Sequence, residues 1–227
     1  MTQTSGNLAI VILISGAGTN LQAILDAAAG GALPVDIRAV ISNRADAPGL
    51  ERARRAGVAA EVVDHKQYAD RHRFDQALQA RIDRYRPGLV VLAGFMRILT
   101  PEFARHYRGR LLNIHPSLLP RFRGLNTHAR ALDEGAATHG ASVHFVTDEL
   151  DGGPVILQAE LPVLPDDTPQ TLAARVLEQE HRIYPLVIEW FAQGRLRLSE
   201  DGVILDGIRL HTPCRFDPSS ATVNRCP

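Results

Sequence analysis

An amide and an imidazole stand two residues apart at the end of an apolar run. The run begins at Leu111, carries Asn113 and His115, and stops at Pro116. In a strand, residues i and i+2 lie on the same face, so both side chains would project together from the strand's carboxyl end. The pair combines a neutral hydrogen-bond donor with a group that titrates near neutral pH. Taken alone, this pattern fits a catalytic pair and a purely structural strand end equally well.

A carboxylate further along the chain is the third candidate for chemistry. Asp151 stands before two glycines in the loop 147–154, where the backbone can approach a cleft closely. Beside His115 it would orient the imidazole and favour its protonated form. The alternative is that Asp148, Glu149 and Asp151 form an ordinary solvated loop.

A glycine-rich turn follows the first apolar run. It covers residues 15–20, Ser-Gly-Ala-Gly-Thr-Asn, and a helical pattern starts at Leu21. A strand, a glycine turn and a helix start aim backbone N–H groups and the positive end of the helix dipole at one place, which suits a phosphate. The third glycine of a dinucleotide fingerprint and the lysine of a P-loop are missing. A single terminal phosphate is therefore favoured, and the alternative is a turn that only lets the helix pack.

Strand and helix patterns alternate along the first half of the chain. Apolar runs at 8–14, 36–41, 60–63, 89–93 and 111–115 predict strands separated by helices. This alternation predicts a parallel sheet with right-handed crossovers, and hence a single-domain, doubly wound, Rossmann-like α/β fold. Its ligand cleft would lie at the strands' carboxyl ends, where the strand order reverses between the first strand and the fourth.

The second half of the chain predicts an antiparallel addition to that sheet. Segments 141–146 and 155–160 read as two strands joined by the loop that carries Asp151. A long helix is expected to reach about residue 183, before Tyr184-Pro185 interrupts it. Residues 1–210 are therefore assigned to one domain. Residues 211–227 have little hydrophobic content and are expected to form a polar, flexible tail.

Composition bounds the partners and the location. The chain has 227 residues, with 25 basic and 25 acidic side chains, so no overall positive field favours nucleic acid. A small-molecule partner is expected instead. The apolar runs are too short to span a membrane and the N-terminus shows no signal pattern, which predicts a cytoplasmic protein. Cys214 and Cys226 fit neither a disulfide framework nor a zinc site, and they are expected to be reduced thiols.

Several of these segments together are more specific than any one of them. They are residues 15–22, 96–99, 113–117, 139–144 and 148–154. They resemble the formyltetrahydrofolate-dependent formyltransferase family, and the resemblance runs over about residues 8–194. The glycine turn and Gln179-Glu180-His181 indicate the branch that formylates phosphoribosylglycinamide. One departure is Asn126, because the family often has histidine there.

The resemblance implies a reaction and its participants. The formyl group of 10-formyltetrahydrofolate would pass to the amine of 5-phosphoribosylglycinamide in de novo purine (IMP) synthesis, giving formylglycinamide ribonucleotide and tetrahydrofolate. No metal is implied, and the enzyme would be a monomer or a homodimer. A relative that formylates initiator tRNA or releases formate would be expected to carry a further domain. An alternative of another class is a non-catalytic module that binds a nucleotide through the glycine turn alone.

The resemblance also implies roles for individual residues. Asn113, His115 and Asp151 would be catalytic. Gly18, Thr19 and Asn20 would hold the substrate's phosphate, and Glu180 would bind its ribose hydroxyls. The implied folate-binding residues are Arg71, Met96, Arg97, Ile98, Leu99, Asn113, Thr147, Asp148 and Asp151.

Overall fold

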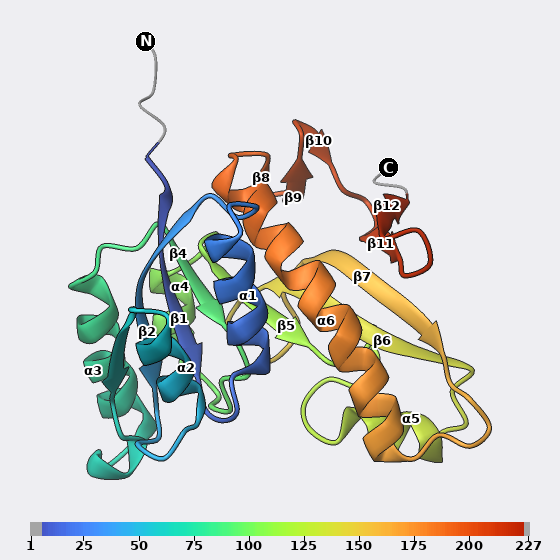
Figure 1. Ribbon diagram of the computed structural model, residues 1–227, viewed down its shortest axis with the longest axis horizontal. Helices are drawn as coiled ribbons and strands as arrows, with labels where there is room; N and C mark the ends of the chain where they lie inside the picture. The colour runs from blue at the N-terminus through green and yellow to red at the C-terminus, as the bar shows by residue number, and fades with distance from the viewer. Residues whose placement is uncertain (1–5, 225–227) are drawn as a thin grey trace.

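A nine-stranded sheet forms the centre of the molecule in the computed structural model, which describes residues 6–224 (Figure 1). Its strands are β1 (Leu8–Ile14), β2 (Val35–Ser42), β3 (Ala59–Val62), β4 (Leu89–Leu92), β5 (Leu111–His115), β6 (Thr138–Phe145), β7 (Val155–Pro162), β11 (Cys214–Asp217) and β12 (Thr222–Asn224). They follow the order β12-β11-β7-β6-β5-β4-β1-β2-β3. The pairs among β1 to β5 are parallel, whereas β6 is antiparallel to both β5 and β7. The predicted mainly parallel sheet with antiparallel C-terminal strands is confirmed.

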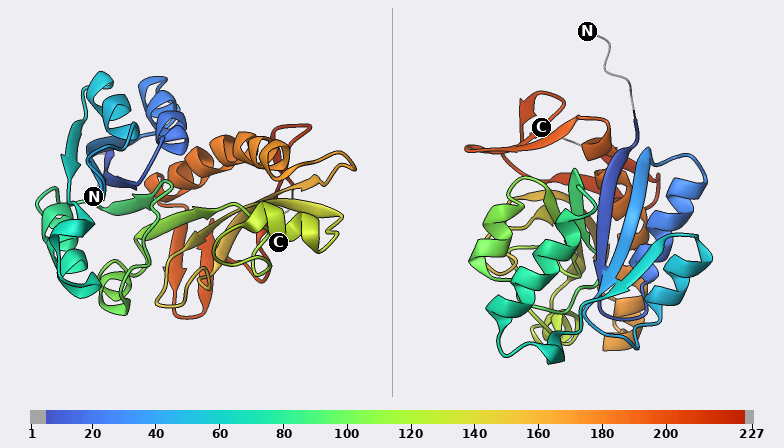
Figure 2. Two further views of the ribbon diagram at one scale, coloured as in Figure 1. Left: turned by 90° about the horizontal axis from the view of Figure 1, so that it is seen from below. Right: turned by 90° about the vertical axis from the view of Figure 1, so that its left-hand side faces the viewer.

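Helices cover both faces of this sheet (Figure 2). One face carries α1 (Thr19–Ala29), α2 (Gly49–Arg55) and α6 (Pro169–Ala192), and the other carries α3 (Arg71–Asp83) and α4 (Pro101–His106). The 3-10 helix η1 (His65–Gln67) precedes α3, and α5 (Thr127–Asp133) contacts α6.

Two hydrophobic cores result, one on each face. Along β1, Ile10, Ile12 and Ile14 belong to the core that contains α1 and α6, while Val11 and Leu13 belong to the other. Successive side chains of a strand point to opposite faces, so a strand covered on both sides must be apolar throughout. β4 lies directly beside β1, which puts the reversal of strand order between these two strands, as predicted.

The long helix α6 differs from the sequence expectation. It continues without a break from Pro169 to Ala192, through Pro185. A proline removes one hydrogen bond from the helix ladder, but packing on either side can offset that loss. Tyr184, Val187 and Ile188 are fully buried, and the Tyr184 hydroxyl donates to the carbonyls of two neighbouring strands at 2.9 and 3.1 Å. Burial and these hydrogen bonds therefore let the helix continue across the proline.

The C-terminal segment also differs from its expectation. Within the described part of residues 211–227, β11 pairs in parallel with β7, and β12 pairs with β11. Cys214 and Phe216 alternate with exposed residues and are buried against the main core, so the segment is an edge of the sheet rather than a flexible tail. Cys214 is disulfide-bonded, so the expected reduced thiol is wrong there. Cys226 lies outside the described residues.

Between α6 and β11 the chain forms a small separate sheet. Its strands β8 (Leu196–Ser199), β9 (Gly202–Leu205) and β10 (Ile208–Arg209) are antiparallel.

Candidate active site

The pairing of β5 with β6 places four polar side chains side by side. In the antiparallel register, Asn113 lies opposite His144, and His115 lies opposite Ser142. Directly paired residues of neighbouring strands share a face of the sheet, so their side chains meet. His115 and His144 are both buried, with 6% and 2% of their surfaces exposed.

His144 is a neutral imidazole whose tautomer follows from its neighbours. Its Nδ1 lies 2.9 Å from the Phe145 carbonyl oxygen, which can only accept, so Nδ1 carries the proton. Burial holds the pKa of His144 well below its usual range. Its Nε2 is therefore an acceptor, and it receives a hydrogen bond from the Asn113 Nδ2 at 3.1 Å. This contact fixes the orientation of the Asn113 amide.

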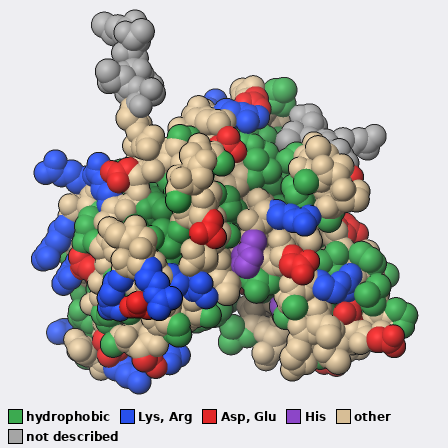
Figure 3. Space-filling view, viewed as in Figure 1, with side chains coloured by type: hydrophobic (Ala, Val, Ile, Leu, Met, Phe, Trp, Pro, Cys, Tyr) green, Lys and Arg blue, Asp and Glu red, His purple; other side chains and the backbone are tan. Residues whose placement is uncertain are grey.

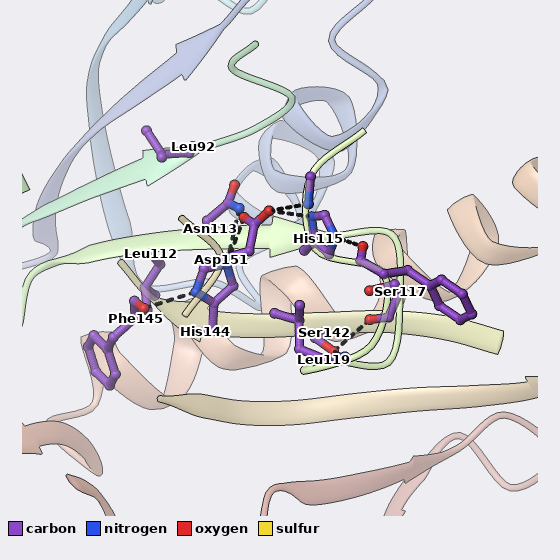
Figure 4. Close-up of polar contacts among 12 residues, drawn as sticks. Leu92, Leu112, Asn113, His115, Ser117, Leu119, Ser142, His144, Phe145 and Asp151 are labelled. Atoms are coloured by element: carbon purple, nitrogen blue, oxygen red, sulfur yellow. Dashed lines mark hydrogen bonds and ion pairs between the residues drawn. The ribbon is translucent and has the colours of Figure 1, made fainter. Parts of the chain in front are cut away.

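Asp151 faces both histidines from the loop after β6 (Figure 4). Its Oδ2 lies 3.5 Å from the His115 Nδ1 and accepts a hydrogen bond from the Gly124 N–H at 2.9 Å. Its Oδ1 lies 3.9 Å from the His144 Nε2, too far for a hydrogen bond. The carboxylate therefore lies beside His115, as predicted, and only 10% of its side chain is exposed.

The second ring nitrogen of His115 is occupied by the backbone. Its Nε2 donates to the Phe122 carbonyl oxygen at 2.9 Å, so Nδ1 is the nitrogen that faces Asp151. The loop that supplies this carbonyl is held by buried polar groups of β6 and β7. The Ser142 hydroxyl accepts from the Leu119 N–H at 3.0 Å, and the Gln158 amide donates to the Leu119 carbonyl at 2.8 Å. Neighbouring strands thus orient the imidazole ring.

The loop that carries Asp151 takes an unusual path. Asp151 has a φ of 47°, a conformation that side-chain-bearing residues rarely adopt. A Cβ on Gly153 would lie 1.8 Å from the Phe145 carbonyl oxygen, so only glycine fits there. Glu149, in the same loop, forms an ion pair with Arg123. The structure thus joins the loops that follow β5 and β6 around the carboxylate.

The glycine turn lies at the N-terminus of α1 and is supported by α2. Gly18 is the N-cap residue at φ 71°, and no side chain caps the first turn of α1. A Cβ on Gly18 would lie 2.8 Å from the Gly49 Cα. The Gly49 N–H donates to the Gly16 carbonyl at 3.0 Å, and the Arg52 Nε donates to the Ala17 carbonyl at 2.8 Å. An uncapped helix start held open in this way can receive an anion.

Asn20 and Glu180 meet beside this turn. The Asn20 Nδ2 donates to the Glu180 Oε2 at 2.6 Å, which brings α1 and α6 together. Burial raises the pKa of Glu180 to about 7, and the hydrogen bond from Asn20 opposes that rise. The Asn20 Oδ1 is buried without a partner in the described part of the chain. A buried acceptor beside a buried carboxylate suits a ligand with hydroxyl groups.

Residues 96–99 form an apolar surface after β4. Met96 is 68% exposed and Ile98 is 56% exposed, whereas Leu99 is half-buried. The Arg97 guanidinium lies over the Phe74 ring at 5.9 Å, and its Nε is buried without a partner among residues 6–224. Exposed apolar residues at a strand's carboxyl end are a typical wall of a ligand pocket.

The remaining predicted folate-binding residues lie further out. Arg71 is exposed in the first turn of α3, and Asp75 is buried one turn further along the helix. Burial raises the pKa of Asp75, and the charges of Arg71 and Arg97 oppose that rise. Thr147 is half-buried and Asp148 is exposed in the loop before Asp151. Thr147 and Asp148 are therefore close to Asp151 along the chain, but no hydrogen bond or ion pair joins them to Asn113, His115 or Asp151 among the described residues.

These groups occupy one side of the molecule. The surface is hollowed between the part over α1 and the part over α5 (Figure 3). Across residues 6–224, no three His, Cys, Asp or Glu side chains are grouped as metal ligands would be. No helix in the same range is long and apolar enough to cross a bilayer.

The sequence interpretation missed three groups of the site. They are His144, the Phe122 carbonyl and the Gly124 N–H. His144 could have been found by aligning β5 and β6 as an antiparallel pair. In the register that puts a polar residue of β6 opposite Asn113, that residue is His144. The two backbone groups have no signal in the sequence, because any residue could supply them.

Comparisons with known proteins agree with the fold. A formyl transferase family model matches residues 8–188, and the chain belongs to this family. It is 59% identical to the phosphoribosylglycinamide formyltransferase of Escherichia coli K12, over 88% of this chain and 95% of that protein. The enzyme of the same name from Haemophilus influenzae is 49% identical, over 87% and 93%. The structure of phosphoribosylglycinamide formyltransferase from Coxiella burnetii has 56% identity and a TM-score of 0.86, with 90% and 96% covered.

Proposed function

We propose that this protein transfers the formyl group of 10-formyltetrahydrofolate to the amine of 5-phosphoribosylglycinamide, giving formylglycinamide ribonucleotide and tetrahydrofolate. The single observation that carries the proposal is the cluster of an oriented amide, an imidazole and a carboxylate beside it. These are the groups that acyl transfer to an amine requires. The identity to full-length enzymes of that name supports the choice of substrates.

The amide and the imidazole serve the oxygen of the formyl group. When the amine adds to the formyl carbon, negative charge develops on that oxygen. The Asn113 Nδ2, held by His144, and the His115 Nδ1 are donors that converge on the same side of β5. Preorganised donors of this kind stabilise an oxyanion because they need no reorganisation during the reaction.

Asp151 assists the proton transfer that accompanies formyl transfer. Its carboxylate lies beside the His115 Nδ1 and helps to orient the imidazole. The attacking amine must lose a proton and the folate nitrogen must gain one. Asp151 can hold a water molecule that carries this proton between the two nitrogens.

The other half of the site binds the two substrates. The first turn of α1, with Gly18, Thr19 and Asn20, would hold the phosphate, and Glu180 would accept hydrogen bonds from the ribose hydroxyls. Residues 96–99 and the loop of Thr147 and Asp148 would surround the pterin, and Arg71 would contact the outer part of the folate. The reaction as proposed needs no metal.

A spectrophotometric assay tests the proposal. The protein is mixed with 10-formyltetrahydrofolate, and formation of the folate product is followed with and without phosphoribosylglycinamide. Turnover that depends on phosphoribosylglycinamide is the expected result. Folate product formed equally well without this acceptor would instead indicate hydrolysis, and no turnover at all would indicate a binding module.

We further propose that the protein acts in the cytoplasm as a monomer or homodimer, on small molecules and without nucleic acid. The equal numbers of basic and acidic residues support the last point. Light scattering of the purified protein measures the oligomeric state.

A further inference from the structure

A buried hydroxyl lies between the two halves of the site. Ser15 is the first residue of the glycine turn, directly after β1, and it is 5% exposed. Its Oγ lies 2.7 Å from the Met96 N and 2.6 Å from the Asn43 Oδ1. Its own N–H donates to the Gly94 carbonyl at 3.1 Å. One serine therefore contacts the segment after β4 twice and the segment after β2 once.

The direction of each hydrogen bond is fixed by chemistry. The Met96 N–H can only donate, so the Ser15 oxygen accepts from it. The hydroxyl proton is then free for the Asn43 Oδ1, which can only accept. Asn43 is 2% exposed, so loss of this hydroxyl would leave the Asn43 Oδ1 buried without a partner and the Met96 N–H without its acceptor.

The position of the 96–99 segment depends on such contacts. The Met96 and Ile98 side chains are mostly exposed, so packing does not fix them. Leu99 packs against the core that contains Phe74. The backbone is held by Ser15 at one end and, at the other, by the Thr100 N–H, which donates to the buried Asp75 at 2.6 Å. Ser15 is also the residue from which the phosphate turn departs.

We propose that Ser15 is a positioning residue that sets the folate-contacting segment at a fixed distance from the phosphate turn. The inference rests on the proposed function, because it assigns one substrate to each side of the hydroxyl. Transfer between two bound molecules depends steeply on their relative placement, and a misplacement of about 1 Å costs on the order of a hundredfold in rate. Ser15 would contribute through that placement, without touching either substrate.

Ser15→Ala is the direct test. We expect kcat to fall roughly 10- to 100-fold and the KM for 10-formyltetrahydrofolate to rise about tenfold. The Kd for phosphoribosylglycinamide, measured by calorimetry without folate, should change less than about threefold, because the first turn of α1 is held separately by α2. Ser15→Thr retains the hydroxyl and should recover most of kcat.

Two further variants separate positioning from general destabilisation. Ser199→Ala removes a hydroxyl that donates to the Gly202 carbonyl at 2.9 Å, in the small sheet, and should leave both kinetic constants unchanged. Asn43→Ala removes the other end of the hydrogen-bond chain. Combined with Ser15→Ala, it should cost less than the sum of the two single changes, because both interrupt one chain.

The outcomes distinguish the inference from the proposed function. A lower unfolding midpoint in Ser15→Ala with unchanged kcat and KM would mean a purely structural serine and would overturn the inference. Equal losses of affinity for both substrates would overturn it as well. A wild-type protein without acceptor-dependent turnover would overturn the proposed function instead.

Discussion

A neutral histidine lies beside the carboxylate of the candidate site and orients the Asn113 amide. His144 faces Asp151 at 3.9 Å, yet burial lowers its pKa and keeps it neutral, although the hydrogen bond from its Nδ1 to the Phe145 carbonyl opposes that shift. Were it charged, it would compete with His115 for the carboxylate, and it would repel the Asn113 N–H group instead of accepting from it. In each histidine one ring nitrogen donates to a backbone carbonyl, and the two rings differ in the group that the other nitrogen faces, which is Asn113 for His144 and Asp151 for His115.

Substitutions of the amide and the carboxylate should lower the rate without unfolding the protein. Asn113→Ala removes one donor to the developing oxyanion, which is typically worth about 3 kcal/mol, so we expect kcat to fall about a hundredfold or more. Asp151→Asn keeps an acceptor for the Gly124 N–H but loses the charge beside His115, and a similar loss is expected. Steady-state kinetics and circular dichroism measure both effects. Near-normal rates in either variant would exclude that residue from the chemistry.

Glu180 predicts a pH dependence of stability. Burial raises its pKa to about 7 from 4.5, so the native state binds this proton more tightly than the unfolded state does. The resulting stabilisation is complete below about pH 4.5 and is lost as the pH rises through about 7, by up to about 3 kcal/mol. Glu180→Gln cannot ionise and still accepts from Asn20. From pH 5 to pH 8 the wild type should therefore lose stability that Glu180→Gln does not lose, so the difference in free energy of unfolding between them should shift in favour of the variant.

Urea unfolding at these two pH values measures the difference. A constant offset between Glu180→Gln and the wild type at both pH values would contradict the raised pKa. The same variant should bind phosphoribosylglycinamide more weakly at pH 8, because an amide is a poorer acceptor for ribose hydroxyls than a carboxylate.

At the scale of elements, the site depends on which strands are neighbours. The apolar runs and glycine turn predict the parallel half of the sheet well, because buried strands and helix starts have strong local signals. The position of Asp151 beside His115 was also predicted, although the residues alone left a solvated loop as the alternative. The antiparallel partner of β5 was not predicted, and with it the role of His144. Such a register depends on packing across the sheet rather than on local sequence.

The uninterrupted α6 is a similar case. Local propensity predicts a break before Pro185, because proline removes one backbone hydrogen bond. The burial of Tyr184, Val187 and Ile188 along the whole helix outweighs that preference. Glu180 lies on this uninterrupted helix, where it accepts a hydrogen bond from Asn20.

The contact between α1 and α2 gives a prediction at this scale. Gly18 and Gly57 both have φ 71°, but only at Gly18 would a Cβ meet a neighbour, the Gly49 Cα at 2.8 Å. Both alanine variants carry the same backbone strain of about 1–2 kcal/mol. Gly18→Ala should lower the free energy of unfolding by roughly 1–3 kcal/mol more than Gly57→Ala, because its Cβ also overpacks the turn.

The two variants should also differ in their effect on substrate binding. Gly18→Ala should raise the KM for phosphoribosylglycinamide about tenfold or more, since it shifts the backbone proposed to hold the phosphate, whereas Gly57→Ala should not. Chemical denaturation and steady-state kinetics of the two variants measure this. Equal effects in both variants would show that the turn does not depend on close packing against α2.

At the scale of the whole molecule, the sheet is longer than the reaction requires. β11 and β12 extend it on the side of β7, away from the paired ends of β1 and β4. Arg215 forms an ion pair with Glu160 of β7 at 3.0 Å, and the Arg182 side chain of α6 donates to the Pro218 carbonyl at 3.0 Å. An exposed strand edge can pair with other chains, so a segment that covers it protects the molecule from association.

Phe216→Ala tests whether this edge contributes to stability independently of catalysis. Phe216 is 6% exposed and belongs to the core that contains α6, so its loss should cost about 3 kcal/mol of the free energy of unfolding. Val223→Ala, on the neighbouring strand, removes a smaller and half-buried side chain and should cost about 1 kcal/mol or less. Both variants should keep the wild-type kcat, because the amide, imidazole and carboxylate are held by β5, β6 and their loops. Urea unfolding combined with steady-state kinetics separates the two properties. A fall in kcat in Phe216→Ala under conditions where the protein remains folded would mean that the edge of the sheet also influences the reacting groups.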